Sequence, residues 1–191
     1  MHKILFLIIA LSYSAQARPI TQSVHESIPS ILNLDVKKTK NIIVNNNDII
    51  IRYHGRSEQS GNTTLSTVNS AITYFLQYLD MLNIGYREQC IDLDLDIYEI
   101  TNEELNNRSL MNFLSWHKWN NNDIYGIYDS VNSRRGVGSI FFSGTIQNEN
   151  VKLGIIAHEV SHFIQEVYCI DRNQESMSRD FERFYRDKLY L

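Results

Sequence analysis

Two histidines four residues apart, His158 and His162, stand at the ends of the segment HEVSH. Side chains at this spacing lie one turn apart on the same face of a helix, so both imidazoles can reach one zinc ion. Zinc held by three protein ligands lowers the pKa of a bound water toward neutrality, and a neighbouring carboxylate can accept the proton as the water attacks a carbonyl. The segment therefore predicts two zinc ligands and a general base, Glu159. The alternative is a helix whose two histidines are ordinary surface or core residues.

The third zinc ligand must come from a segment that returns to this helix. Glu166 shares the face of the histidines but lies eight residues beyond His158. That is about 12 Å along the axis at about 1.5 Å per residue, so one ion cannot join both. Residues 169–173 (CIDRN) can make the turn, and Asn173 suits the N-cap of a helix that begins near residue 174. Glu175, in the first turn of that helix, is the predicted third ligand.

Other residues of the C-terminal helix bear on this assignment. Ser178 is small and lies one turn beyond Glu175, which favours a close approach to the metal. Glu182 lies two turns from Glu175 on the same face and is the alternative ligand, although it is better suited to hold a histidine. The apolar face of the helix includes Phe181 and Phe184 and points away from Glu175. A solvent-exposed Glu175 that binds no metal is therefore the other interpretation.

The elements that position these residues follow from hydrophobic periodicity. Apolar residues at spacings of three and four predict helices, whereas alternating or β-branched runs predict strands. Asn-rich and Gly-containing turns join two pairs of strands, which predicts two hairpins. Because helices and antiparallel strands are mixed without regular alternation, the predicted fold class is α+β with a small mixed or antiparallel sheet. Helices are expected at 65–82, 102–116, 152–168 and 174–189, and strands at 42–44, 49–53, 91–97, 124–128 and 139–142.

The strand expected at 91–97 alternates apolar residues with Asp92, Asp94 and Asp96. This alternation is typical of a strand with one face in water. The aspartates also raise a calcium hypothesis, but side chains on one strand face point in parallel and lack the looped ligands of a calcium site. A solvated strand face is the preferred interpretation.

The segment AHEVSH, with the strand-like SIFFSG before it, resembles the zincin metallopeptidases, and the resemblance extends over residues 124–191. It implies that residues 139–144 form the antiparallel edge strand that aligns the substrate backbone. The metzincin pattern needs Gly and His where Gln165 and Tyr168 stand, and no GTxxxD follows. The gluzincin arrangement remains, in which a Glu from a following helix completes the site. The segment QESMSRDFE is similar to the short helices of small gluzincin-like proteins.

The composition of the chain limits the classes of function that it can have. The chain has 191 residues, of which 43% are hydrophobic, and a formal net charge of −4. These values predict one globular domain. The acidic balance provides no electrostatic footprint for nucleic acid or for an anionic membrane, so neither is expected as a partner.

An apolar run, ILFLIIAL, follows His2 and Lys3 and precedes Ala15-Gln16-Ala17. The run is too short to span a bilayer, and small residues flank a larger one, as cleavage by signal peptidase requires. We expect residues 1–17 to be a secretory signal peptide and residues 18–191 to be a single, exported zincin-like catalytic domain. A core helix at the N-terminus is the alternative.

Export bears on the two cysteines, Cys90 and Cys169. In an oxidising compartment an even pair most simply forms one disulfide. The alternatives are two buried free thiols or a role in metal binding.

Five further residues are candidates for the site, although each is more simply explained as a core or surface residue. Three tyrosines and an arginine could donate a hydrogen bond to an oxyanion, and one histidine could be a fourth zinc ligand. These residues are Tyr128, Tyr168, Tyr185, Arg134 and His117.

Together these features predict a secreted zinc metallopeptidase that acts on peptides or proteins. One zinc ion would be bound by His158, His162 and Glu175, with Glu159 as general base. A secreted binding or effector protein with a structural zinc site is one alternative, and a zinc amidase acting on a non-protein amide is another. Glu159 favours an enzyme, because a structural site has no use for that carboxylate.

Overall fold

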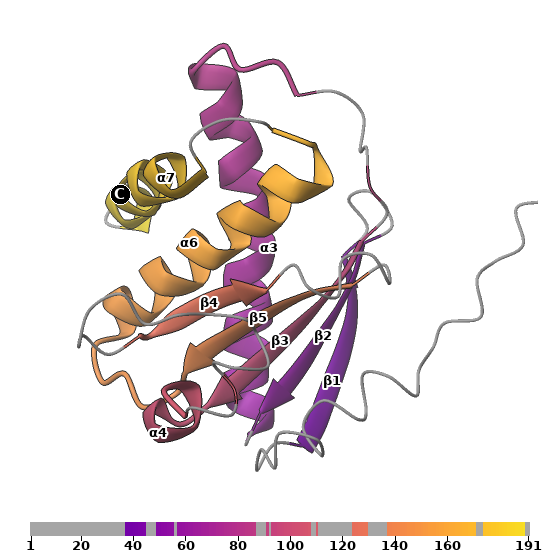
Figure 1. The fold of residues 1–191 in the computed structure, drawn as a ribbon, viewed down its shortest axis with the longest axis vertical. Coiled ribbons are helices and arrows are strands. Elements are labelled where there is room, and N and C mark those ends of the chain that lie inside the picture. Colours follow the sequence, from indigo (N-terminus) through magenta and orange to yellow (C-terminus); the bar gives the residue numbers. More distant parts are fainter. Residues whose placement is uncertain are drawn as a thin grey trace, which may run out of the picture.

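The computed structural model describes residues 37–44, 49–55, 57–86, 91, 93–107, 110, 124–129, 137–170 and 174–189. Within these residues a five-stranded sheet carries two long helices on one face, and the C-terminal helix packs beside them (Figure 1). The fold is mixed α+β, as the sequence predicted. In chain order the elements are β1 (Lys37–Val44), β2 (Ile49–Gly55), α3 (Glu58–Met81), β3 (Asp94–Ile100), α4 (Asn102–Leu105), β4 (Gly126–Asp129), β5 (Val137–Ser143), α6 (Glu149–Val167) and α7 (Gln174–Leu189).

The strands of the sheet are arranged in the order β1-β2-β3-β5-β4. β1 pairs antiparallel with β2, β2 and β5 both run parallel to β3, and β4 pairs antiparallel with β5. The parallel strands β2 and β3 need a long crossover, which α3 supplies. Both antiparallel pairs predicted from the sequence are confirmed, and the sheet is mixed.

The prediction that residues 139–144 form an edge strand is wrong. β5 lies between β3 and β4, and every residue from Val137 to Ser143 is buried. β4 occupies the edge of the described sheet, and its residues alternate between half-buried and buried. An inner strand is covered on both faces and reads as a continuous apolar run, which fits the segment VGSIFFS better than an edge position does.

α3 and α6 pack against the same face of the sheet and against each other. α3 begins after Ser57, whose side chain caps the helix by accepting a hydrogen bond from the Ser60 N–H. α7 packs on α6 and adds three buried side chains, Met177, Phe181 and Tyr185, to the same core. Core side chains of the two long helices include Leu65, Val68, Ile72, Phe75 and Leu79 of α3 and Ile156, Val160, Phe163 and Ile164 of α6.

The opposite face of the sheet is also buried, so the expected solvated face of β3 is wrong. Asp96 has no exposed surface, and the guanidinium of Arg52 on β2 lies 3.3 Å from its carboxylate. Arg52 also pairs with Asp94. Tyr98 stacks on Phe141 of β5, with ring centroids 4.7 Å apart. Asp96 and the half-buried Asp94 therefore balance a buried arginine and do not form the predicted solvated face, and Asp92 lies outside the described residues.

A buried carboxylate ties the ends of four elements together. Glu99 of β3 accepts hydrogen bonds from Tyr53 of β2, from Ser60 of α3 and, at 3.0 Å, from Lys152 of α6. Burial raises the pKa of Glu99, but these hydrogen bonds outweigh that effect and hold the pKa below its usual value. The cluster fixes the first turn of α6, the helix that carries the histidines.

Several predictions fall wholly or partly outside the described residues. The expected signal peptide, residues 1–17, is one of them. α4 spans four residues and begins after Thr101, which forms a capping box with Glu104. Most of the predicted helix 102–116 lies beyond the described part. Cys169 is disulfide-bonded, and its predicted partner, Cys90, lies outside the described ranges. None of the helices in the described ranges has both the length and the apolar composition needed to cross a membrane.

Candidate metal centre

α6 presents its two histidines to α7. The helix begins after Asn148, whose side chain accepts a hydrogen bond from the Val151 N–H at 3.2 Å. Its apolar residues face the core, and His158 and His162 lie one turn apart on the half-buried side, with ring centroids 5.0 Å apart. Gly154 lies one turn before His158, and a Cβ atom there would overlap the guanidinium of Arg186 on α7. The absence of a side chain at this position leaves room for the Arg186 guanidinium.

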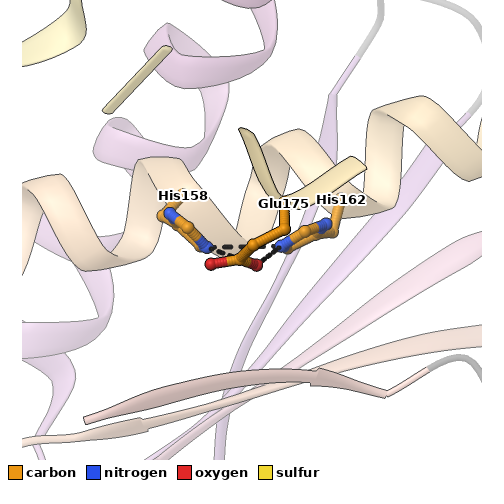
Figure 2. Close-up of side chains that lie close together, drawn as sticks. All are labelled: His158, His162 and Glu175. Carbon is orange, nitrogen blue, oxygen red and sulfur yellow. Dashed lines mark hydrogen bonds and ion pairs between the residues drawn. The ribbon is translucent and has the colours of Figure 1, made fainter. Parts of the chain in front are cut away.

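Three predicted ligand atoms converge between the two helices (Figure 2). The Nε2 atoms of His158 and His162 are 3.2 Å apart. The Oε2 atom of Glu175 lies 3.6 Å from the first and 3.4 Å from the second. Around a tetrahedral zinc ion with bonds of about 2.0–2.1 Å, neighbouring donor atoms lie about 3.3–3.4 Å apart. The three atoms therefore enclose a space of the size that one zinc ion occupies.

The described part of the chain contains no second group of three His, Cys, Asp or Glu residues whose potential ligand atoms lie this close together. The buried acidic residues of the sheet, including Asp96 and Glu99, are not part of such a group. His158, His162 and Glu175 are thus the described residues best placed to hold a metal.

Glu182 lies beside the other nitrogen of His158. Its Oε2 atom lies 3.3 Å from His158 Nδ1, and its Oε1 atom accepts a hydrogen bond from Arg186. A carboxylate in this position fixes the tautomer that leaves Nε2 free for a metal. Glu182 therefore occupies the supporting position that the sequence favoured for it.

Ser178 and Gln165 support His162. Ser178 is fully buried, and its hydroxyl lies 3.3 Å from His162 Nδ1. The same hydroxyl accepts a hydrogen bond from the side chain of Gln165 at 3.0 Å. The sequence indicated only that Ser178 is small, and it gave no sign that Gln165 takes part, because the two residues meet only when α6 and α7 pack.

Glu175 projects from the exposed side of α7, as its distance from the apolar face suggested, and still reaches both histidines. Its side chain is 53% exposed. Its second oxygen, Oε1, accepts a hydrogen bond from Arg179 at 2.8 Å, which turns Oε2 toward the imidazoles. Arg179 was not singled out from the sequence, although its i, i+4 spacing from Glu175 is the signal that could have found it.

Glu159 lies on the side of α6 that faces β4. Its carboxylate accepts a hydrogen bond from the backbone N–H of Tyr128, and a Cβ atom at Gly126 would come 2.8 Å from its Oε1. Burial raises the pKa of Glu159 to about 7, while neighbouring His158 and the Tyr128 N–H favour the ionised form. Glu159 is not one of the three converging ligands, so its carboxylate is available for a different task.

Three tyrosines named as oxyanion donors have other contacts. The Tyr128 hydroxyl donates to Glu166, and burial raises its pKa. The Tyr185 hydroxyl lies 2.6 Å from the hydroxyl of Ser70, inside the core. Tyr168 is buried, and its ring packs edge-on against that of Tyr86. The remaining two candidates, at positions 117 and 134, lie outside the described residues.

Comparison with protein-family models, curated proteins and solved structures finds no match for this chain. The zincin resemblance therefore rests on residues 124–191 alone. The function of the site must be inferred from its own geometry and chemistry.

Proposed function

We propose that this chain is a zinc-dependent metallopeptidase with a zincin-like fold of the gluzincin type. The observation that carries the proposal is the spacing of the three donor atoms of His158, His162 and Glu175, at 3.2, 3.4 and 3.6 Å. Such distances suit ligands of one tetrahedral zinc ion. Three protein ligands leave a fourth position open, which is the arrangement of catalytic zinc sites, whereas structural sites are closed by four.

The ligands are supported as a metal site requires. A carboxylate oxygen of Glu182 lies 3.3 Å from the far nitrogen of His158, the Ser178 hydroxyl lies 3.3 Å from that of His162, and Arg179 donates a hydrogen bond to the far oxygen of Glu175. Partners of this kind orient the ligands before a metal arrives. A chance meeting of two histidines and a glutamate would not explain why each has a polar partner beside its second atom.

Glu159 supplies the base. When bound, zinc lowers the pKa of a water molecule toward neutrality and polarises a peptide carbonyl. Glu159 adjoins His158 in the helix and faces β4, so its carboxylate can accept the proton of the attacking water and pass it to the leaving amine. The Tyr128 N–H holds the carboxylate in this orientation.

The edge strand β4 favours an extended peptide as substrate. In the described sheet, β4 is hydrogen-bonded to β5 on one side. The backbone N–H of Tyr128 donates a hydrogen bond to the Glu159 carboxylate and so does not pair with β5. Glu159 therefore lies at the outer edge of β4. Backbone groups along such an edge can pair with an added strand, which would pass beside the base.

The N-terminal segment extends the proposal to location. A signal peptide at residues 1–17 and a disulfide between Cys90 and Cys169 would place the mature enzyme outside the cytoplasm. Its partners would then be extracellular or periplasmic peptides and proteins, not nucleic acid or a membrane.

The test compares two glutamate variants of the same helix. Glu159→Gln should abolish hydrolysis of a broad peptide library while zinc content, measured by metal analysis, stays at one ion per chain. Glu149→Gln, which removes an exposed carboxylate in the first turn of α6, should retain activity. A chelator should inactivate the wild type, and added zinc should restore it.

Three outcomes would contradict the proposal. Activity of Glu159→Gln within a few-fold of wild type would remove the base from the mechanism. Bound zinc without hydrolysis of any peptide would point to a binding or effector protein, and cleavage of peptidoglycan fragments in place of peptides would point to an amidase.

A further inference from the structure

A cavity of about 350 Å³ opens beside His158 on the α7 side of the proposed zinc site. It is lined by His158, Glu182 and three arginines of α7: Arg179, Arg183 and Arg186. The three arginines and Glu182 recur at spacings of three and four along α7, so they form one stripe that borders α6 at His158. The cavity, called the arginine pocket below, lies beside the proposed zinc ligands. Its arginines and Glu182 are not among the three ligand residues.

Among the described residues that line the arginine pocket, guanidinium groups outnumber carboxylates. Three guanidinium groups line it against one carboxylate, that of Glu182. Two of the three already hold acidic side chains of the site, since Arg179 bonds Glu175 and Arg186 bonds Glu182. The Nε atom of Arg186 is buried and finds no hydrogen-bond partner among the described residues. Since Arg183 pairs with Asp180, each of the three arginines has one acidic partner on α7, and a ligand carboxylate would bind where the weakest of these pairs gives way.

Arg183 is the most available cation of the three. Its side chain is 78% exposed and pairs with Asp180 at 3.3 Å, whose side chain is 58% exposed. A pair in water contributes little, so a ligand can displace Asp180 at small cost. A guanidinium offers parallel N–H groups that match a carboxylate, which makes Arg183 suited to binding one from outside.

We propose that the arginine pocket binds a carboxylate of the peptide substrate close to the scissile bond. This inference rests on the proposed peptidase function and adds a preference for acidic substrates. His158 carries it, because this residue both lines the pocket and supplies a ligand atom. A carboxylate in the pocket would therefore lie beside one of the proposed metal ligands. None of the described residues that line the pocket is apolar, so an apolar side chain would find no partner among them.

The carboxylate has two possible sources, an acidic side chain and the C-terminus of the substrate. Three sets of Ala/Ser hexapeptides separate them: a single Glu with both ends blocked, the matching Gln peptide with both ends blocked, and the Gln peptide with a free C-terminus. Binding of the first set identifies a side chain, and binding of the third identifies a chain end and an exopeptidase.

Binding is measured by calorimetry on the zinc-loaded Glu159→Gln protein, which should bind without hydrolysis. Arg183→Gln in this background should weaken binding of the carboxylate peptides about tenfold, because one charge-assisted contact is lost. Arg183 is chosen because Arg179 and Arg186 hold acidic residues of the metal site. Lys188→Gln is the control, since it removes one positive charge from α7 at a residue that packs on Phe184 and does not line the pocket.

The expected result is a loss of affinity in Arg183→Gln and unchanged affinity in Lys188→Gln. Equal binding of the Glu and Gln peptides, no binding of either carboxylate set, or an equal loss in the Lys188 variant would overturn the proposal. A carboxylate bound directly by zinc would survive Arg183→Gln, which also overturns it. If binding depends on Arg183 but the wild type cleaves no peptide, the pocket stands and the peptidase function falls.

Discussion

Replacing Glu175 by alanine should weaken zinc binding by about two to three orders of magnitude. Four-ligand zinc sites bind with about 10–16 kcal/mol, or about 2.5–4 kcal/mol per ligand, and about 1.4 kcal/mol corresponds to one decade of affinity. Glu175 supplies one of the three donor atoms. Its side chain is 53% exposed and packs on little else, so the fold should survive. Circular dichroism would verify this, and titration against a chromophoric chelator would give the dissociation constant.

Glu182→Ala and Asp180→Ala complete the experiment. Glu182 supports His158 without supplying a donor atom to the group, so its loss should cost about 10–100-fold. Asp180 is an acidic residue of the same helix that pairs with Arg183 at the surface, and its loss should leave the affinity unchanged. A greater loss in Glu182→Ala than in Glu175→Ala would refute the ligand assignment. An equal loss of zinc affinity in Asp180→Ala would show that any negative charge on α7 has this effect, whichever residue carries it.

Three further outcomes follow from the packing. Gly154→Ala should displace the Arg186 guanidinium and lower zinc affinity severalfold, which chelator titration would measure. The thermal stability of the metal-free chain should stay constant or rise, because alanine favours the helix. Glu99→Gln should cost about 3–5 kcal/mol in denaturant unfolding, since it leaves a buried lysine unpaired. Because folding lowers the pKa of Glu99, its ionised carboxylate stabilises the fold fully above the usual glutamate pKa, and this stabilisation is lost as the pH falls. The free energy of unfolding of Glu99→Gln should therefore decrease less in acid than that of the wild type. An acid profile equal to that of the wild type would contradict this. If Cys90 and Cys169 form a disulfide, the denatured, unreduced protein should contain no reactive thiol. By closing a long loop, the bond should raise the free energy of unfolding by about 4 kcal/mol. Two titratable thiols would exclude the disulfide.

The parts of the site that were predictable depend on short-range geometry. The spacing of His158 and His162 is a property of one helix, and the rise per residue excludes Glu166 from the same ion. The short segment between α6 and α7 limits where a returning ligand can stand. These arguments need no knowledge of the sheet, and they brought Glu175 to the position where the structure has it.

The parts that were not predictable depend on which surfaces meet. Alternation along β3 indicates two different faces, but it does not reveal that Arg52 of β2 lies beside Asp96 and keeps that face out of water. The order of β4 and β5 in the chain likewise does not determine which strand lies at the edge. Gln165 became part of the site only through its contact with Ser178 on another helix.

Since α6 supplies the two histidines and α7 supplies Glu175, a bound zinc ion would cross-link the C-terminal helix to the rest of the molecule. A ligand that binds only the folded chain raises the free energy of unfolding by about 1.4 kcal/mol for each tenfold excess over its dissociation constant. The last helix should then resist digestion by other proteases better in zinc-rich than in zinc-poor medium, even in a variant without the general base. The lifetime of the protein would follow the zinc supply of its surroundings.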